Sequence, residues 1–405
     1  MGNTISTTAL FHPNESTYED NLNGLVFIPE LMDIDVDTFL GNATFEVLHK
    51  DDNIKELKKK KFPALFLYHP NETKTKETIM YYHSNSCDLG DIYEELHYLY
   101  KYLHVNILAI EYVGFGLCYL EGSTNQYNIN RRALAAYNFL CSLNLKSENI
   151  LLFGRSIGTG AATKLAYILK LLNKNVGGII LHAPFISIQK LAEDYTKYAS
   201  YFIENIYDNY KNLTVLSNNN DLDTPILIIH GQKDEVINIY HSQFLIENLK
   251  NKFIQHSYPE DSYHNEYYII DDLGIPIKSF IKTFRKTEQG EPVEIVIPKN
   301  FLIKKFVESK KKTVSHGIKK KKVEQNEEGN DNVNQLKKRS KELKHKESKH
   351  NESKHNESKH NESKHNESKH NESKHNEPKD NESKHNESKH NKPKYNEPKD
   401  NENNQ

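Results

Sequence analysis

The sequence predicts an α/β fold in which a mostly parallel sheet carries helices on both faces, with a small helical insertion and a polar C-terminal tail. Short apolar strands alternate with helical segments from residue 78 to residue 284, which is typical of a parallel sheet. A Gly-x-Ser-x-Gly sequence at 154–158 separates one apolar strand from a run of small residues. Beyond residue 300, lysine clusters and a short repeat replace most of the apolar content.

Composition divides the 405 residues into four parts. They are an N-terminal, acylated lead-in at 1–22, whose residues 7–22 are polar and expected to be flexible, a globular domain at 23–299, a basic linker at 300–344 and a low-complexity tail at 345–405. The tail repeats His-Asn-Glu-Ser-Lys with Pro and Asp variants and has no apolar cluster to bury, so we expect it to be disordered. Its regularly spaced histidines suggest loose metal binding, but a solvated expansion is the simpler interpretation.

The first strands of the domain are expected to be antiparallel, because short turns connect them. The expected strands are 25–28, 45–49 and 64–68, and a basic turn at 58–61 precedes the third. Turn residues such as Gly24 and Pro29 bound the first of them.

The parallel part of the sheet begins at residue 78. Its expected strands are 78–83, 105–112, 151–153, 178–182, 225–230 and 253–258. The expected helices are 92–103, 129–143, 156–172, 240–249 and 275–284. An insertion at 185–223, with helical pieces around 187–210, is long enough for a short cap over a site but too short for a lid domain. A further strand at 294–298 has no evident place in the sheet.

Ser156 lies at a strand-to-helix turn with Gly154 and Gly158 two positions to either side. This pattern is typical of a nucleophile elbow, in which a strained turn exposes the serine and side chains at the two glycines would clash. The pattern alone is equally compatible with a glycine-rich turn and an exposed serine. The decision therefore depends on whether the chain supplies a base and an acid.

Asp234 is the candidate acid. In α/β hydrolases the acid follows the serine along the chain and lies beyond a later strand. Asp234 comes just after the apolar strand 225–230, at the sheet edge where ligand chemistry concentrates. Its competitors are Asp221, Asp223, Asp261 and Asp271, which do not follow such a strand end.

His264 is the candidate base. It lies six residues after the strand 253–258, in the loop where this fold places the base. We assign His230 and His256 to strands as core or face histidines, and His241 to a helix.

The backbone N–H groups of Ile157 and Asn85 are the candidate oxyanion donors. One donor follows the nucleophile, and the second comes from the loop after an early strand, here 83–90. Cys87 in that loop is interpreted as a small buried residue, because no base accompanies it. This chemistry requires no metal and no cofactor.

The three cysteines are far apart and odd in number, which suits a reducing compartment. We expect no signal peptide and no membrane-spanning segment, because no apolar run is long enough. Gly2 and Ser6 fit a signal for N-myristoylation. One myristoyl chain binds a membrane weakly, and the lysine clusters at 304–322 provide a second signal if they bind anionic lipids. A solvated linker or a nuclear-type basic run explains these lysines equally well.

The chain resembles the serine hydrolases of the α/β-hydrolase superfamily, in particular the bud-emergence-46-like and domain-containing-protein-17-like group. The matching stretches, in family order, are HSNSCDLG (83–90), EYVGFG (111–116), FGRSIGTG (153–160), HGQKDEVI (230–237) and YHNE (263–266). The family's triad maps onto Ser156, Asp234 and His264. The family usually has Gly where this chain has Ser84, and Asp where it has Glu111, so the shape of the oxyanion loop is the open question.

The resemblance implies hydrolysis of esters or thioesters through an acyl-enzyme, with S-acylated proteins as one substrate class. A lysophospholipase or lipid esterase is the alternative enzyme, and a non-catalytic membrane-anchored scaffold is the alternative outside catalysis. We expect a peripheral location on the cytoplasmic face of a membrane, or in the cytoplasm if Gly2 is not acylated. The expected partners are the acyl substrate and the membrane surface, and no nucleic acid.

Overall fold

The computed structural model describes residues 11–13, 15–37, 46–70, 73–196, 206–217, 223–284 and 292–304. Gly2, the linker from residue 305 and the repeat at 345–405 lie outside these residues, as do nearly all of the lysines at 304–322. No helix within the described ranges combines the length and the apolar character that a bilayer crossing requires.

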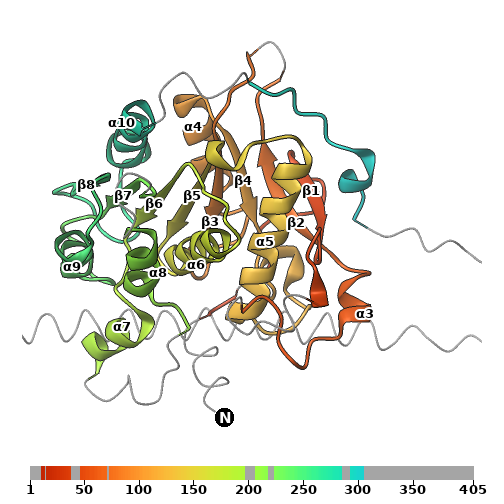
Figure 1. Ribbon diagram of the computed structural model, residues 1–405, viewed down its shortest axis with the longest axis horizontal. Coiled ribbons are helices and arrows are strands. Elements are labelled where there is room, and N and C mark those ends of the chain that lie inside the picture. Colours follow the sequence, from red (N-terminus) through yellow and green to blue (C-terminus); the bar gives the residue numbers. More distant parts are fainter. Residues whose placement is uncertain are drawn as a thin grey trace, which may run out of the picture. The chain divides into compact units, whose positions relative to one another are not determined.

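A sheet of eight strands runs through the described domain in the order β1-β2-β4-β3-β5-β6-β7-β8 (Figure 1). The strands are β1 Leu25–Pro29, β2 Lys61–Leu67, β3 Thr78–Tyr82, β4 Asn106–Ile110, β5 Ile150–Arg155, β6 Gly178–His182, β7 Ile226–Ile229 and β8 Ile254–Ser257. β2 pairs antiparallel with β1 and with β4, and every pairing from β4 to β8 is parallel. The predicted fold class is confirmed.

Helices cover both faces of the sheet (Figure 1). The α-helices of the described residues are α3 Ile54–Leu57, α4 Tyr93–Leu103, α5 Gln126–Ser142, α6 Gly158–Leu171, α7 Ile188–Tyr195, α8 Asn209–Leu216, α9 Tyr240–Asn248 and α10 Ile275–Phe284. One apolar core lies under α5, α6 and α8, and a second lies under α4 and α10. The parallel strands β3 to β7 are buried on both faces, which is why they are almost continuously apolar, whereas the edge strand β8 is partly exposed and mostly polar.

The strand expected at 45–49 is wrong for the described residues 46–49. Glu46 has a φ of +49°, which an extended strand does not allow. The backbone N–H of His49 donates to the Asp52 carboxylate over 2.8 Å and closes a turn instead.

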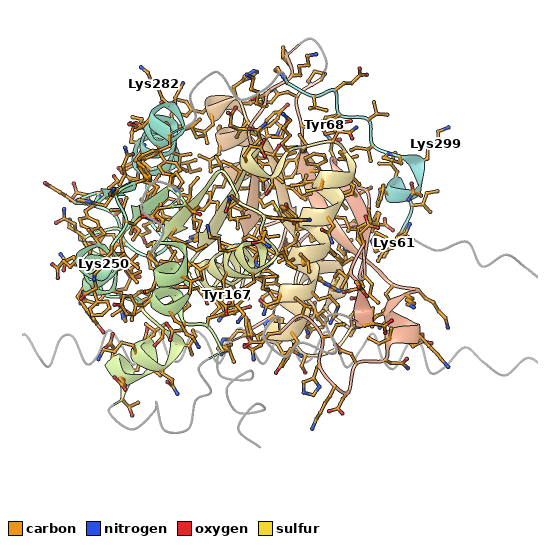
Figure 2. The ribbon with its side chains drawn as sticks, viewed as in Figure 1. Lys61, Tyr68, Tyr167, Lys250, Lys282 and Lys299 are labelled. Atoms are coloured by element: carbon orange, nitrogen blue, oxygen red, sulfur yellow. The ribbon has the colours of Figure 1, made fainter. Side chains whose placement is uncertain are left out.

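The strand expected at 294–298 is also wrong. This segment is extended but pairs with no strand of the described sheet. Phe301 packs edge-on against Phe139 of α5, with ring centroids 4.8 Å apart. Lys61 Nζ at the start of β2 donates to the backbone carbonyls of Asn300 and Ile303 over 2.5 and 3.1 Å. Figure 2 shows Lys61 and Lys299 on the same side of the domain. Side chains, rather than strand pairing, therefore hold this segment in place.

The insertion at 185–223 contributes α7 and α8. Tyr207, just before α8, lies so close to Gly160 of α6 that a Cβ on the glycine would come within 2.4 Å of its ring. The Asn209 side chain donates to Thr159 Oγ1 and to the backbone carbonyl of Phe185, over 3.0 and 2.9 Å. The start of α8 is thus fixed to the helix that follows Ser156.

Candidate active site

Ser156 occupies the sharp turn between β5 and α6, with a φ of +53°. A Cβ on Gly154 would lie 2.3 Å from the carbonyl oxygen of Gly158, and a Cβ on Gly158 would lie 2.1 Å from that of Tyr82. The turn is therefore open only to glycine at both positions. The Ser156 N–H donates to the carbonyl of His182 on the neighbouring strand over 2.9 Å, which fixes the serine backbone.

Three side chains from distant parts of the sequence meet at this turn. His264 Nε2 lies 3.1 Å from Ser156 Oγ, and His264 Nδ1 lies 2.8 Å from Asp234 Oδ2. The other oxygen of Asp234 accepts the backbone N–H groups of Val236 and Ile237 over 2.9 and 2.7 Å. The structure thus brings together the serine, base and acid predicted from the sequence.

His230 is a member of this cluster that sequence reasoning assigned to the core. Its ring is fully buried, with Nε2 3.2 Å from Asp234 Oδ2 and 2.8 Å from the carbonyl of Ile237. Its Nδ1 lies 2.6 Å from the Ser242 hydroxyl. With two acceptors around Nε2, the proton belongs on that nitrogen and the Ser242 hydroxyl donates to Nδ1. Its position in the sequence was the signal that could have revealed it, since His230 directly follows β7 and lies four residues before Asp234.

The Asp234 carboxyl is held in its ionised form. Burial of this side chain raises its pKa, but hydrogen bonds from His230, His264 and the Ile237 N–H outweigh that effect. The net result is a pKa well below the usual value for an aspartic acid. A charged carboxylate is the form that can orient His264 and stabilise its imidazolium.

The candidate oxyanion donors come from two segments of the chain, the loop at 83–90 and the turn after Ser156. Asn85 and Ile157 both line the cavity onto which Ser156 and His264 open. Within the described residues, the backbone N–H of neither one donates to a protein acceptor. Ile157 also stands at the N-terminus of α6, where the helix dipole favours negative charge.

Glu111 anchors the oxyanion loop at 83–90. Its buried carboxylate accepts the backbone N–H of Leu89 over 3.2 Å and lies 3.2 Å from His83 Nε2. The Tyr18 hydroxyl donates to the same carboxylate over 2.8 Å. Glu111 therefore connects its own segment with the loop at 83–90 and with the lead-in.

Residues 11–13 and 15–22 of the lead-in pack against the domain, whereas its polar sequence led us to expect a flexible segment. Phe11 and Tyr18 are buried. The N–H of His12 donates to Asn85 Oδ1 over 2.9 Å, and Asn85 Nδ2 lies 3.1 Å from His12 Nδ1. Thr17 bonds to the Asp88 carboxylate through both its N–H and its hydroxyl. In the sequence of this polar segment, the aromatic residues Phe11 and Tyr18 were the signal that could have indicated such packing.

A cavity of about 620 Å³ opens beside Ser156. Its apolar wall comes from α7 and from the residues that follow Asp234; it consists of Ile188, Leu191, Ala192, Tyr195, Val236 and Ile237. The oxyanion loop supplies most of the opposite wall. The predicted cap is thus an apolar surface directly beside the nucleophile.

Cys87 is half-buried and lines this cavity, which corrects its interpretation as a buried residue. Its Sγ lies 3.3 Å from the hydroxyl of Ser84. In the part of the chain that the structure describes, no group of three or more His, Cys, Asp or Glu side chains is arranged to hold a metal ion.

The sequence relatives described here are all named as alpha/beta hydrolases. No family model matches the sequence. The chain is 29% identical over 213 residues to a putative alpha/beta hydrolase of Acanthamoeba polyphaga mimivirus, covering 53% of this chain and 75% of that protein. It is 28% identical over 207 residues to human alpha/beta hydrolase domain-containing protein 17B, covering 51% and 66%. A 17C protein of Xenopus tropicalis is 27% identical over 208 residues, covering 51% and 62%. The chain thus spans slightly under two thirds of the length of these vertebrate relatives.

Solved structures include a putative hydrolase from Agrobacterium vitis, with a TM-score of 0.41 and 20% identity over 55% of this chain and 94% of that one. A Pyrococcus furiosus esterase has a TM-score of 0.42 and 14% identity over 58% and 96%. The sheet order, the elbow and the named sequence relatives together identify the chain as an α/β-hydrolase-fold protein similar to the alpha/beta hydrolase domain-containing protein 17 group.

Proposed function

We propose that this protein is a serine hydrolase that cleaves carboxylic esters or thioesters through an acyl-enzyme. The observation that carries the proposal is the hydrogen-bonded chain from Ser156 through His264 to Asp234, which opens onto an apolar cavity. A serine hydroxyl is a weak nucleophile, and this arrangement supplies the base and the oriented carboxylate that activate it.

The chemistry follows from the positions of the donors. Ser156 Oγ attacks the acyl carbonyl while His264 Nε2 takes its proton, and the carbonyl oxygen becomes an oxyanion that accepts the N–H groups of Ile157 and Asn85. His264 then donates the proton to the leaving alcohol or thiol, which leaves the acyl group on Ser156. Water then attacks the acyl carbon and loses a proton to His264, which returns that proton to Ser156 Oγ as the bond between Oγ and the acyl group breaks, and the acid leaves. Asp234 stays ionised throughout and holds the tautomer of His264.

The acyl group is the part of the substrate that the cavity favours. The apolar wall of α7 with Val236 and Ile237 can bury several methylene groups, at about 0.8 kcal/mol each. Together with the family resemblance, this supports S-acylated proteins as substrates and hence a protein depalmitoylase. A lysophospholipase would use the same wall, because its substrate also carries a long acyl chain. A non-catalytic scaffold is disfavoured by the assembled triad.

Membrane attachment is part of the proposal. Acylation of Gly2 and binding of the lysines at 304–322 to anionic lipids would together provide the two weak signals that stable attachment needs. Such attachment at the cytoplasmic face of a membrane would place the protein beside acylated substrates. Incorporation of a myristate analogue into the wild type, and its absence in Gly2→Ala, is the corresponding test.

The decisive experiment compares the full-length wild type with Ser156→Ala. We expect the variant to lose labelling by a fluorophosphonate probe and to lose up to ~10⁶-fold in kcat on a p-nitrophenyl ester. Ser142→Ala is the matched control, because this hydroxyl only donates to a backbone carbonyl in α5. Labelling that persists at another residue would contradict the assignment, and folded wild type without turnover would favour the scaffold. Turnover of S-acylated peptides against lysophospholipids then ranks the two substrate classes.

A further inference from the structure

Arg155 lies directly before Ser156, at the end of β5, and its side chain contacts both loops that meet at the nucleophile. It is only 6% exposed. Nη2 donates to the backbone carbonyl of His264 over 3.0 Å and to Asn265 Oδ1 over 2.9 Å. Nη1 donates to the Ser84 hydroxyl over 3.4 Å. One guanidinium therefore connects the loop of the base with the loop of an oxyanion donor.

The charge of Arg155 has no direct carboxylate partner among the described residues. Its guanidinium instead faces the ring of Tyr267, with Cζ 5.0 Å from the ring centroid. The Tyr267 hydroxyl in turn donates to Glu95 over 2.6 Å, so Tyr267 links Arg155 to this carboxylate. A buried cation costs several kcal/mol in desolvation, so stability alone is a poor explanation for this residue.

We infer that Arg155 is a positioning residue for the proposed hydrolysis, fixing the His264 loop and the oxyanion loop at the spacing that the reaction needs. The inference rests on the proposed function. Arg155 is absent from the residues that line the cavity, so its effect is exerted through the atoms it holds. The planar guanidinium suits this role, because it presents several donors at fixed angles and a lysine does not.

Ser84 is the contact of Arg155 on the oxyanion loop. A glycine at this position would offer no side-chain acceptor to Nη1. The hydroxyl in this chain thus adds a connection between the loops. Asn265 plays the matching part on the other side, through its side-chain oxygen.

The test measures kcat, KM and the fluorophosphonate labelling rate for Arg155→Gln, Arg155→Lys, Ser84→Ala and the double variant Arg155→Gln/Ser84→Ala. We expect Arg155→Gln to lower kcat about 100-fold with KM changed less than about twofold, since misplaced groups affect the transition state most. Ser84→Ala should lower kcat about fivefold, as expected for one hydrogen bond. Arg155→Lys should restore part of the loss.

Coupling is the critical readout. The double variant should lose no more than Arg155→Gln alone, because the second substitution removes a contact that is already gone. Single losses that multiply in the double variant, or wild-type kcat in Arg155→Gln, would overturn the inference. Ser142→Ala again controls for loss of a remote hydroxyl.

Amide hydrogen exchange separates this inference from the proposed function. Peptides covering 83–90 and 262–268 should exchange faster in Arg155→Gln while α5 and α10 keep their protection, whether or not the wild type hydrolyses esters. If the wild type is inert and only these loops loosen, the proposed reaction fails and the structural link stands. Faster exchange throughout with a lower Tm would make Arg155 merely structural and would overturn the inference.

Discussion

The base side and the oxyanion side of the site are held in different ways. On the base side, Asp234 and His264 emerge from the ends of β7 and β8, and backbone N–H groups only two and three residues from Asp234 fix its carboxylate. On the oxyanion side, the loop at 83–90 depends on Glu111 and on the lead-in residues His12, Thr17 and Tyr18. The first side is built by neighbouring strand ends, and the second by contacts between segments far apart in the sequence.

This difference leads to two expectations. A substitution on the base side removes a group that takes part in the reaction, whereas a substitution on the oxyanion side loosens the contacts that hold the loop at 83–90. The former should lower the rate by orders of magnitude with little change in folding. Substitutions on the oxyanion side should lower kcat by a smaller factor, because they act by displacing the backbone N–H of Asn85. Three experiments test the comparison in order of expected size.

Asp234→Asn should lower kcat about 10⁴-fold, because an amide favours the wrong tautomer of His264. Steady-state ester hydrolysis measures the effect. Asp261→Asn is the control, since this carboxylate pairs with exposed Lys233 and should leave kcat unchanged. A loss of less than tenfold in Asp234→Asn would mean that the acid is not essential, and the contrast between the two sides would disappear.

Tyr18→Phe should lower kcat about fivefold, because it removes one donor from the buried Glu111 carboxylate, worth about 1 kcal/mol or more. The readout is kcat together with exchange of the 83–90 peptide. Tyr98→Phe, at an exposed position on α4, provides the control. If Tm falls but kcat and loop exchange stay at wild-type values, the lead-in stabilises the domain without shaping the oxyanion loop.

The third prediction is about the pH dependence of folding stability, which His182 influences, rather than about kcat. Burial, and then the positive charge of Arg155, hold the pKa of His182 well below its usual value. The unfolded chain takes up a proton on this histidine below a pH of about 6.5, and the folded chain does not. Stability therefore falls as the pH drops through this range, by about 1.4 kcal/mol per pH unit for one histidine.

Urea unfolding at several pH values between 7.5 and 5 measures this slope. His182→Gln should have a shallower decline than the wild type over the same range. If the free energy of unfolding declines equally with pH in both proteins, His182 is protonated as readily in the folded chain as in the unfolded one. The base side would then be less rigid than the comparison requires.

The base side could be predicted from the sequence more fully than the contacts that hold the oxyanion side. The order of strands and helices, the elbow glycines and the positions of Asp234 and His264 are all expressed locally, as apolar runs that end in polar or glycine residues. The packing of residues 11–13 and 15–22 could not be read from the sequence, because their partners lie more than 70 positions away. The strand expected at 294–298 failed for a related reason. Its short apolar run reflects burial of Ile295 and partial burial of Ile297 against the core rather than pairing in a sheet.

The backbone conformation of Ser156 affects the stability of the whole domain. A serine with a φ of +53° costs about 1–2 kcal/mol relative to an ordinary backbone conformation. Glycine would adopt the same turn without this cost. The residue that makes the site reactive is therefore one that makes the domain less stable, and reactivity and stability oppose each other at this single position.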